Sequence, residues 1–252
     1  MVQQTTSARA RKARAAARRP VRTGRKRWLV RAAGILVALL VAMPVLLLLL
    51  FRFVPVPGTP QMLVSWAKGE SADYRWVEPR RISPYLARAV IASEDQKFCF
   101  HHGFDWGSID QAVRAHEEGA RLRGASTISQ QTARSLFLLP VHSWIRKGLE
   151  AWFTILEEAL WPKRRILAVY LNLVDWGHGH FGAEAAARAY FHRSAALLTA
   201  KEAARLAAVL PDPDDWRAAR PGPYVAQRTL VLLRRMKAVR RDGLESCLRR
   251  SL

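Results

Sequence analysis

The stretch EDQKFCFHHGFD at residues 94–105 decides how the rest of the chain is interpreted. Two adjacent carboxylates, Glu94 and Asp95, precede a pair of histidines, and aromatic residues stand on both sides of that pair. This mixture suits neither a core nor an ordinary surface, and a positioned carboxylate is a common general acid or base. The stretch therefore indicates a catalytic site, and a solvated loop after a helix is the alternative.

The segments on either side of this stretch carry different signals. Ser83 and Pro84 are typical of a helix start, as cap and first helical residue. Apolar residues between 86 and 90 follow at helical spacing, so we predict a helix that ends at Glu94. On the other side, residues 114–123 are polar, poorly periodic and interrupted by glycine, and we predict a mobile connection there.

The sequence GASTISQQTARSLFL follows at residues 124–138, with Ser126 as a candidate helix cap. Thr127, Gln131 and Arg134 stand at i, i+4 and i+7 and would share one helical face. A hydroxyl, an amide and a guanidinium in one row near a helix start can hold an anion such as a phosphate. A solvated helix face is the alternative.

Helical spacing recurs through the second half of the chain, while strand-like alternation is scarce, so we predict a mostly α fold. Arg146 and Glu150 lie one turn apart, and such a pair is by default a surface ion pair worth a few tenths of a kcal/mol. The glycine-rich residues 177–182 predict a flexible loop, whose two histidines lack a third metal ligand nearby. The predicted helices are 144–160, 163–173, 183–191, 199–210 and 223–241.

The charge distribution is uneven. The 252 residues include 41 Lys and Arg against 20 Asp and Glu, a formal net charge of +21, and eleven of the basic residues lie between Arg9 and Arg31. The uncharged residues 32–51, AAGILVALLVAMPVLLLLLF, are long enough to cross a hydrocarbon core of about 30 Å. We therefore predict a basic cytoplasmic tail at 1–31, a transmembrane anchor at 32–52, a linker at 53–60 and a folded domain at 61–252.

The basic cluster before the span predicts that the N-terminus is cytoplasmic and that the chain after residue 52 lies outside. A basic arm could also bind nucleic acid, but one that precedes a span is better explained as a topology signal in contact with anionic lipid. Nucleic acid is therefore not an expected partner. A cleaved signal peptide, the alternative to an anchor, would have a shorter apolar region and a small-residue cleavage site.

The two cysteines, Cys99 and Cys247, are far apart in the sequence and belong to no disulfide framework or zinc-ligand spacing. We expect two free thiols, although an oxidising compartment would permit a bond between them.

With these residues in view, the chain resembles the monofunctional biosynthetic peptidoglycan glycosyltransferases of glycosyltransferase family 51, stand-alone relatives of a domain in bifunctional penicillin-binding proteins. Residues 94–105 resemble the family's first motif, residues 124–138 the second, and RKGLE at 146–150 the third. Later segments at 166–177 and 198–213 resemble the remaining motifs, so the resemblance covers about residues 79–213. It implies a mostly α, lysozyme-like glycosyltransferase domain tethered by one N-terminal transmembrane helix.

The activity that this resemblance implies is the polymerisation of lipid II into β-1,4 glycan strands in cell wall assembly. The displacement would invert the anomeric carbon and release undecaprenyl pyrophosphate, without transpeptidase activity. The implied location is the bacterial inner membrane, with the catalytic domain periplasmic. The implied partners are lipid II, the growing glycan strand, the membrane, and cell-wall synthesis and division proteins.

The resemblance also assigns roles. Glu94 matches the catalytic base on the acceptor hydroxyl, and Glu150 matches the second essential carboxylate, with a divalent cation (Mg²⁺ or Mn²⁺) near Glu150 left open. Cations at the third motif would stabilise the pyrophosphate leaving group. The implied substrate-binding residues are Asp95, Phe98, His101, Gly103, Thr127, Gln131, Arg134, Arg146 and Lys147.

Some residues depart from the family pattern. Arg134 stands where lysine is usual and offers a planar fork in place of a compact ammonium, while Ala125 replaces a common glycine and Ser135 a common asparagine. None of these changes removes a carboxylate. A muramidase or lytic transglycosylase of similar fold, which would cut glycan, and a degenerate scaffold that recruits cell-wall machinery are the alternatives. Phe104, Trp106 and Ile109 are further predicted to form an apolar lip that enters the membrane.

Overall fold

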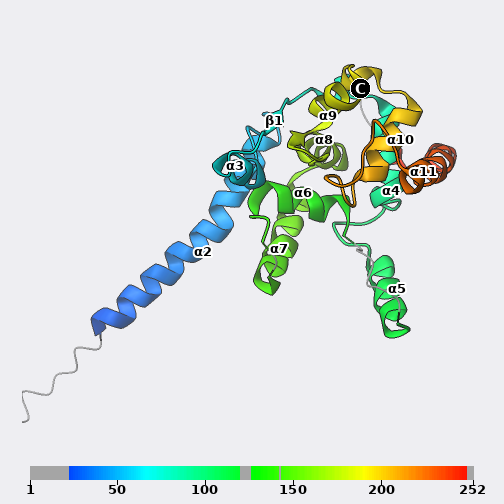
Figure 1. Ribbon diagram of the computed structural model, residues 1–252. Helices are drawn as coiled ribbons and strands as arrows, with labels where there is room; N and C mark the ends of the chain where they lie inside the picture. The colour runs from blue at the N-terminus through cyan, green and yellow to red at the C-terminus, as the bar shows by residue number, and fades with distance from the viewer. Residues whose placement is uncertain (1–22, 120–125, 142, 249–252) are drawn as a thin grey trace, which may run out of the picture. The chain divides into compact units, whose positions relative to one another are not determined.

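The computed structural model describes residues 23–119, 126–141 and 143–248, and these are mostly helical, as predicted (Figure 1). The described residues divide into two units, one that ends at Leu46 and one that begins at Leu47. The elements in chain order are α2 (Thr23–Phe51), α3 (Pro60–Ala67), β1 (Asp73–Tyr74), η1 (Pro79–Arg81), α4 (Pro84–Glu94), α5 (Trp106–Glu117), α6 (Ile128–Phe137), α7 (Trp144–Leu160), α8 (Lys163–Leu173), β2 (His180–Phe181), α9 (Ala183–Phe191), η2 (Ala195–Leu197), α10 (Ala200–Val209), α11 (Pro223–Arg241) and η3 (Ser246–Leu248).

Helix α2 is the predicted membrane segment. Its residues Lys26–Phe51 are long and apolar enough to cross a membrane, and most of their side chains are exposed to the surroundings. Pro44 lies within the helix, where a membrane helix tolerates it. The helix is therefore compatible with a single-pass membrane protein.

The last turn of α2 and the residues after it belong to the second unit. The Leu48 carbonyl accepts a 2.7 Å hydrogen bond from Nε1 of Trp161, and Nε of Arg165 donates to the Phe51 carbonyl at 2.8 Å. In the predicted linker, the Val56 side chain is buried and the Thr59 hydroxyl caps α3. This segment is therefore packed against the rest of the second unit by specific contacts.

The core of the second unit is built from helices that contact one another in two groups. Helices α4, α10 and α11 pack together, and helices α6, α7 and α8 pack together. Residues 166–173 of α8 are buried without interruption, and buried alanines on α9 and α10 let their neighbours approach closely. The first group presents the end of α4 to the start of α6 in the second, and this meeting point contains Glu94.

The helix predictions from 83 onward are confirmed apart from two caps and one connection. Ser83 precedes α4, but its hydroxyl donates to the Leu198 carbonyl at 2.8 Å instead of capping the helix. Thr127, and not Ser126, caps α6, because its hydroxyl and the Gln130 side chain form a capping box. Residues 114–117, predicted as part of a connection, continue α5, whose start is capped by Asp105, and residues 120–123 lie outside the described part.

The loop at 177–182 was predicted to be flexible, and that prediction is wrong for its backbone. His180 and Phe181 pair in parallel with Asp73 and Tyr74 of β1. A Cβ on Gly179, whose φ is +75°, would lie 1.9 Å from the Ser71 carbonyl oxygen. Glycine is needed here because two backbones approach closely. A glycine-rich sequence of this kind looks flexible, but in this loop it forms an ordered turn.

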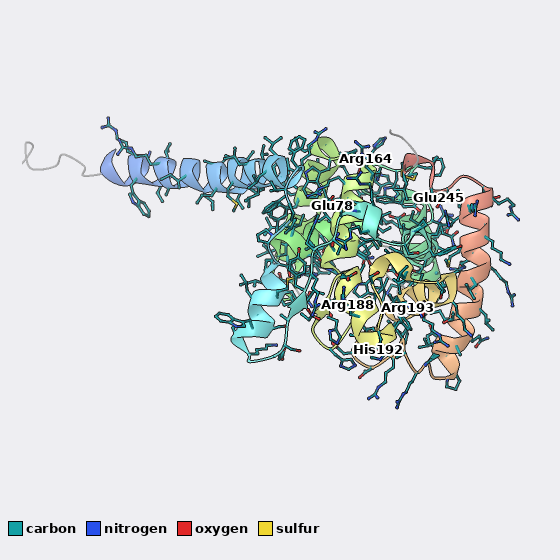
Figure 2. All side chains as sticks on the ribbon, turned by 90° about the horizontal axis from the view of Figure 1, so that it is seen from above. Glu78, Arg164, Arg188, His192, Arg193 and Glu245 are labelled. Carbon is teal, nitrogen blue, oxygen red and sulfur yellow. A yellow bond between two sulfur atoms is a disulfide. The ribbon has the colours of Figure 1, made fainter. Side chains whose placement is uncertain are left out.

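The two cysteines form a disulfide, which corrects the prediction of free thiols. Cys99, five residues after Glu94, is bonded to Cys247 in η3, with their Cα atoms 5.4 Å apart. An ion pair nearby joins Arg88 of α4 to Glu245 at 2.7 Å, and Figure 2 labels Glu245 near the end of α11. The sequence could not show this proximity, because it depends on α11 packing along α4.

Candidate functional site

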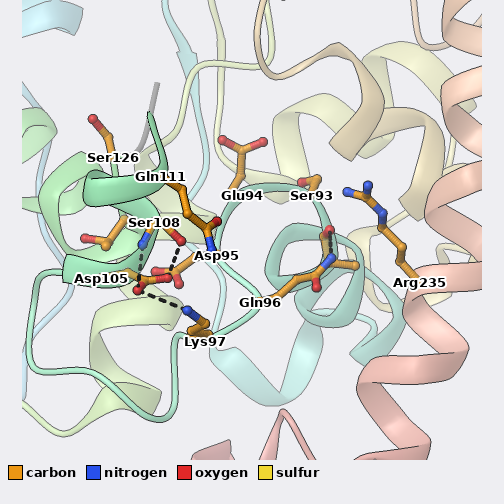
Figure 3. Close-up of a pocket in the computed structure, with 12 residues that line it drawn as sticks. Ser93, Glu94, Asp95, Gln96, Lys97, Asp105, Ser108, Gln111, Ser126 and Arg235 are labelled. Atoms are coloured by element: carbon orange, nitrogen blue, oxygen red, sulfur yellow. Dashed lines mark hydrogen bonds and ion pairs between the residues drawn. The ribbon is translucent and has the colours of Figure 1, made fainter. Parts of the chain in front are cut away.

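A cavity of about 360 Å³ opens where α4 ends and α6 begins (Figure 3). Glu94 lies in its wall, and the cavity also receives residues from the start of α5 and from α11. Its lining is mostly polar. The residues are Ala92, Ser93, Glu94, Asp95, Gln96, Lys97, Asp105, Ser108, Gln111, Ser126, Thr127 and Arg235.

The Glu94 carboxylate is held by neutral donors, chiefly the Gln131 amide. Nε2 of Gln131 donates to Oε2 of Glu94 at 3.1 Å, and the Tyr170 hydroxyl donates to Oε1 of Gln131 at 3.1 Å. Burial raises the pKa of Glu94. The hydrogen bonds from Gln131 and Ser93 and the charge of Arg228 lower it, but burial has the larger effect. A carboxylate with a raised pKa is a better proton acceptor than an ordinary glutamate, which suits a general base.

Asp95, the neighbouring carboxylate, is engaged within the protein. Nε2 of His101 lies 2.9 Å from Oδ2 of Asp95, and the backbone N–H of Ile128 donates to the same oxygen at 3.0 Å. The Gly103 N–H donates to Nδ1 of His101, so the proton of the neutral ring is on Nε2 and points to Asp95. Asp95 and His101 thus join the first motif to the first turn of α6.

Gly103 and Thr127 form a second connection between the two motifs. The Thr127 hydroxyl donates to the Gly103 carbonyl at 2.6 Å and accepts from the Gln130 N–H. Gly103 has a φ of +91°, and a Cβ there would lie 2.9 Å from Cγ2 of Thr154. Phe98 is fully buried, with Nζ of Lys163 4.6 Å from its ring centroid. These residues fix the geometry of the cavity wall.

The predicted anion-binding row on α6 is only partly brought together. The Thr127 hydroxyl is used by the backbone and is buried, whereas Gln131 contacts Glu94 and Arg134 is exposed. Arg134 is close enough to Tyr170 for its charge to lower the pKa of that hydroxyl, although burial dominates and raises it. The three predicted anion-binding side chains therefore reduce to two, the Gln131 amide and the Arg134 guanidinium.

The third motif forms a buried ion-pair cluster on α7. The Glu150 side chain is 2% exposed; Nη1 of Arg146 contacts one of its oxygens at 2.9 Å, and Nζ of Lys147 contacts the other. The default expectation of a surface pair was wrong, because the Glu150 side chain is buried. The three residues act as one charged unit.

The divalent cation left open near Glu150 does not fit this arrangement. Both Glu150 oxygens already face cations, and two positive groups would repel a third. In residues 23–119, 126–141 and 143–248, no group of three or more His, Cys, Asp and Glu side chains is placed to hold a metal ion. We derive no catalytic step through a metal.

Two arginines of α11 belong to the site although the sequence did not identify them. Arg235 lines the cavity, and Figure 3 shows its guanidinium directed from α11 toward the part of the cavity that contains Ser93 and Glu94. Arg228 is partly buried, and its charge acts on Glu94. The two are seven residues apart and share a helical face, but α11 has so many basic residues that spacing alone could not distinguish them.

Comparison with known proteins gives a consistent result. The family model described as "Transglycosylase" matches residues 61–237. The chain is 51% identical over 208 residues to a biosynthetic peptidoglycan transglycosylase of Caulobacter vibrioides, covering 82% of this chain and 91% of the relative. Proteins with the same name are 52% identical over 223 residues in Rhodospirillum centenum (88% and 96% covered) and 50% over 215 residues in Pseudomonas aeruginosa (83% and 88%).

Proposed function

This chain belongs to the transglycosylase family of peptidoglycan synthesis, and we propose that its Glu94 cavity is where lipid II is polymerised. The family establishes the reaction class, a glycosyl transfer from a lipid pyrophosphate that lengthens a glycan strand. The observation that carries the assignment to this cavity is the Glu94 carboxylate, which is partly buried in the cavity wall, has a raised pKa and accepts a hydrogen bond from the neutral Gln131 amide.

In the proposed step, Glu94 accepts the proton of the acceptor sugar hydroxyl as its oxygen attacks the anomeric carbon of the donor. The bond from that carbon to the pyrophosphate oxygen breaks, and the electron pair leaves with the pyrophosphate. Attack opposite the leaving group inverts the anomeric carbon and forms the β-linked product. A sugar hydroxyl is a weak nucleophile at neutral pH, so a positioned base is needed while the bond forms.

Charge develops on the pyrophosphate as the bond breaks, and cations at fixed positions stabilise it best. We assign this work to Arg134 from α6 and to Arg228 and Arg235 from α11. Arg235 lines the cavity, the charge of Arg228 acts on Glu94, and the charge of Arg134 acts on Tyr170. Glu150 is a positioning residue in this account, since it contacts Arg146 and Lys147 directly and holds both side chains in place. Gln131 orients Glu94.

The membrane arrangement is part of the proposal. We assign residues 1–31 to a cytoplasmic tail, 32–52 to the inner-membrane anchor, 53–60 to a linker and 61–252 to a periplasmic glycosyltransferase domain, with cell-wall synthesis and division proteins as further partners. The positive charges before α2 support this orientation. The Cys99–Cys247 disulfide supports it too, because disulfides persist in the periplasm and are rare in the cytosol.

Exposed aromatic side chains support contact with the bilayer near the cavity. The rings of Phe104 and Trp106 stack with centroids 5.4 Å apart, and Trp106 is 71% exposed. Tryptophan favours the membrane–water interface, so we propose that this pair enters the outer leaflet where the lipid-linked substrate resides.

The test is to incubate the purified full-length protein with lipid II and, separately, with isolated sacculi. We expect glycan polymer and free undecaprenyl pyrophosphate from lipid II, and no release of muropeptides from sacculi. Digestion of sacculi without polymer formation would instead identify a lytic enzyme, and inactivity on both substrates would favour a scaffold.

A further inference from the structure

A second cavity, of about 280 Å³, lies where the chain passes from α10 to α11. The rings of Trp216 and Tyr224 form its aromatic wall, with centroids 4.8 Å apart and planes at 52°. Arg217 and Arg220 line it as well and are exposed, and so does one acid, Asp215. None of these residues takes part in the chemistry assigned to the Glu94 cavity.

The position of Tyr224 on α11 connects the two cavities. Tyr224, Arg228 and Arg235 stand at i, i+4 and i+11, which places them on one face of the helix. Arg228 acts electrostatically on Glu94, and Arg235 lines the Glu94 cavity. At a rise of about 1.5 Å per residue, Tyr224 and Arg235 are about 16 Å apart along the axis, a distance that an oligosaccharide can span.

The chemistry of this second cavity suits a sugar that bears acidic groups. Sugar rings present an apolar face of C–H groups that packs on aromatic rings, and ligand sites commonly combine such surfaces with a few orienting polar groups. Among the described residues, neither Arg217 nor Arg220 has a hydrogen bond or ion pair, and a guanidinium binds carboxylates in bidentate fashion. Two guanidiniums against one carboxylate leave the cavity positive.

We propose that the Trp216–Tyr224 cavity is a binding site for the growing glycan strand, remote from the reacting bond. Trp216 and Tyr224 pack against a sugar ring, and Arg217 and Arg220 bind carboxylates of its peptide stem. The α11 face leads the strand from there to Arg228 and Arg235. This assignment rests on the proposed function of the Glu94 cavity, and it adds a site that retains the product between successive additions.

The first test measures binding without catalysis. Lipid-free, uncrosslinked glycan strands with peptide stems are titrated into the full-length protein in detergent and followed by calorimetry. We expect Tyr224→Ala and Arg220→Ala each to raise the Kd by about five- to tenfold, the usual size of an anchoring contact. With strands whose stems have been removed, Arg220→Ala should have no effect, while Tyr224→Ala should still weaken binding.

The matched control is Leu230→Ala, since Leu230 is 57% exposed on a different face of the same helix. Trp216 is partly buried and packs against the core, so Trp216→Phe replaces an alanine variant and melting temperatures are compared throughout. No strand binding by the wild type, or equal weakening in Leu230→Ala, would overturn the proposal.

The second test measures product length with lipid II. Tyr224→Ala should couple the first two lipid II molecules at the wild-type rate but release strands several-fold shorter on average. Unchanged product length together with unchanged strand binding would overturn the second site and leave the Glu94 assignment intact. Failure of the wild type to polymerise lipid II would instead overturn the proposed function, whatever the binding experiment shows.

Discussion

Glu94 and Glu150 are both glutamates of the proposed machinery, but their surroundings differ. Glu94 ends α4 at the wall of a cavity and accepts a hydrogen bond from a neutral amide. Glu150 lies inside the protein on α7, with a guanidinium and an ammonium on its two oxygens. The first carboxylate is free to take a proton, whereas the second is committed to holding cations. The comparison shows that charge partners, more than residue type, decide which carboxylate is the base.

The largest expected effect is on the rate of Glu94→Gln. Removing a positioned general base should lower the rate of lipid II polymerisation by about 10²- to 10⁴-fold. The melting temperature should not fall, because the new amide replaces a carboxylate that burial disfavours. The exposed Glu70→Gln is the matched control and should keep full activity. A Glu94→Gln enzyme with near-normal turnover would remove Glu94 from the mechanism.

Glu150→Gln, unlike Glu94→Gln, should destabilise the protein. It leaves Arg146, whose side chain is 17% exposed, without its carboxylate, and breaking a buried pair costs about 3 kcal/mol. Denaturant unfolding of the detergent-solubilised protein measures this loss. Adding Arg146→Met to Glu150→Gln should restore part of the stability but not the activity. Equal stability of Glu150→Gln and wild type would show that the cluster does not hold the fold.

The surroundings of Glu94 and of Glu150 also differ in how much of their structure could be predicted from the sequence. The helices of residues 84–94 and 144–241 carry regular apolar spacing and were predicted almost to the residue, whereas α5 was not predicted. The candidate base of the first motif was visible too, because Glu94 is the last residue of the predicted helix and carries a carboxylate. The burial of Glu150, the Cys99–Cys247 bond and the approach of Arg228 all depend on which helices pack together. Local spacing does not contain that information.

The disulfide gives a further contrast, because it fastens the Glu94 region covalently while ion pairs hold the Glu150 region. Cys99→Ser with Cys247→Ser should lower the free energy of unfolding by about 2–4 kcal/mol, since the bond closes a long loop. Reduction of the wild type should have a similar effect and should not change the double variant. A wild type indifferent to reductant would mean that the bond contributes nothing to stability.

The smallest effect concerns Glu157, which lies two turns after Glu150 on α7 and is fully buried. Neither of its carboxylate oxygens has a hydrogen-bond partner among the described residues. Burial, reinforced by the charge of Glu158, raises the pKa of Glu157 well above the ordinary value and disfavours its charged form. The neighbouring Lys163 opposes the shift but does not reverse it.

Because the pKa of Glu157 is higher in the folded than in the unfolded protein, this residue lowers the free energy of unfolding as the pH rises from the unfolded pKa to the folded one. Glu157→Gln should therefore raise the free energy of unfolding at neutral pH by about 1 kcal/mol, with a smaller gain in acid. Urea unfolding at several pH values measures this. A loss of stability that is the same at every pH would show that Glu157 has a favourable partner and resembles Glu150.

The contrast between the two glutamates is tested most directly by the dependence of kcat/KM for lipid II on pH, in the wild type and in Gln131→Leu. Glu94 must be deprotonated to act, and its pKa is raised by burial and lowered by the Gln131 hydrogen bond. The wild-type rate should fall in acid with a pKa above about 4.3, the ordinary value for glutamate. In Gln131→Leu this acid limb should move to higher pH. An acid limb at the same pH in both proteins, or none at all, would contradict the assignment of Glu94 as the base.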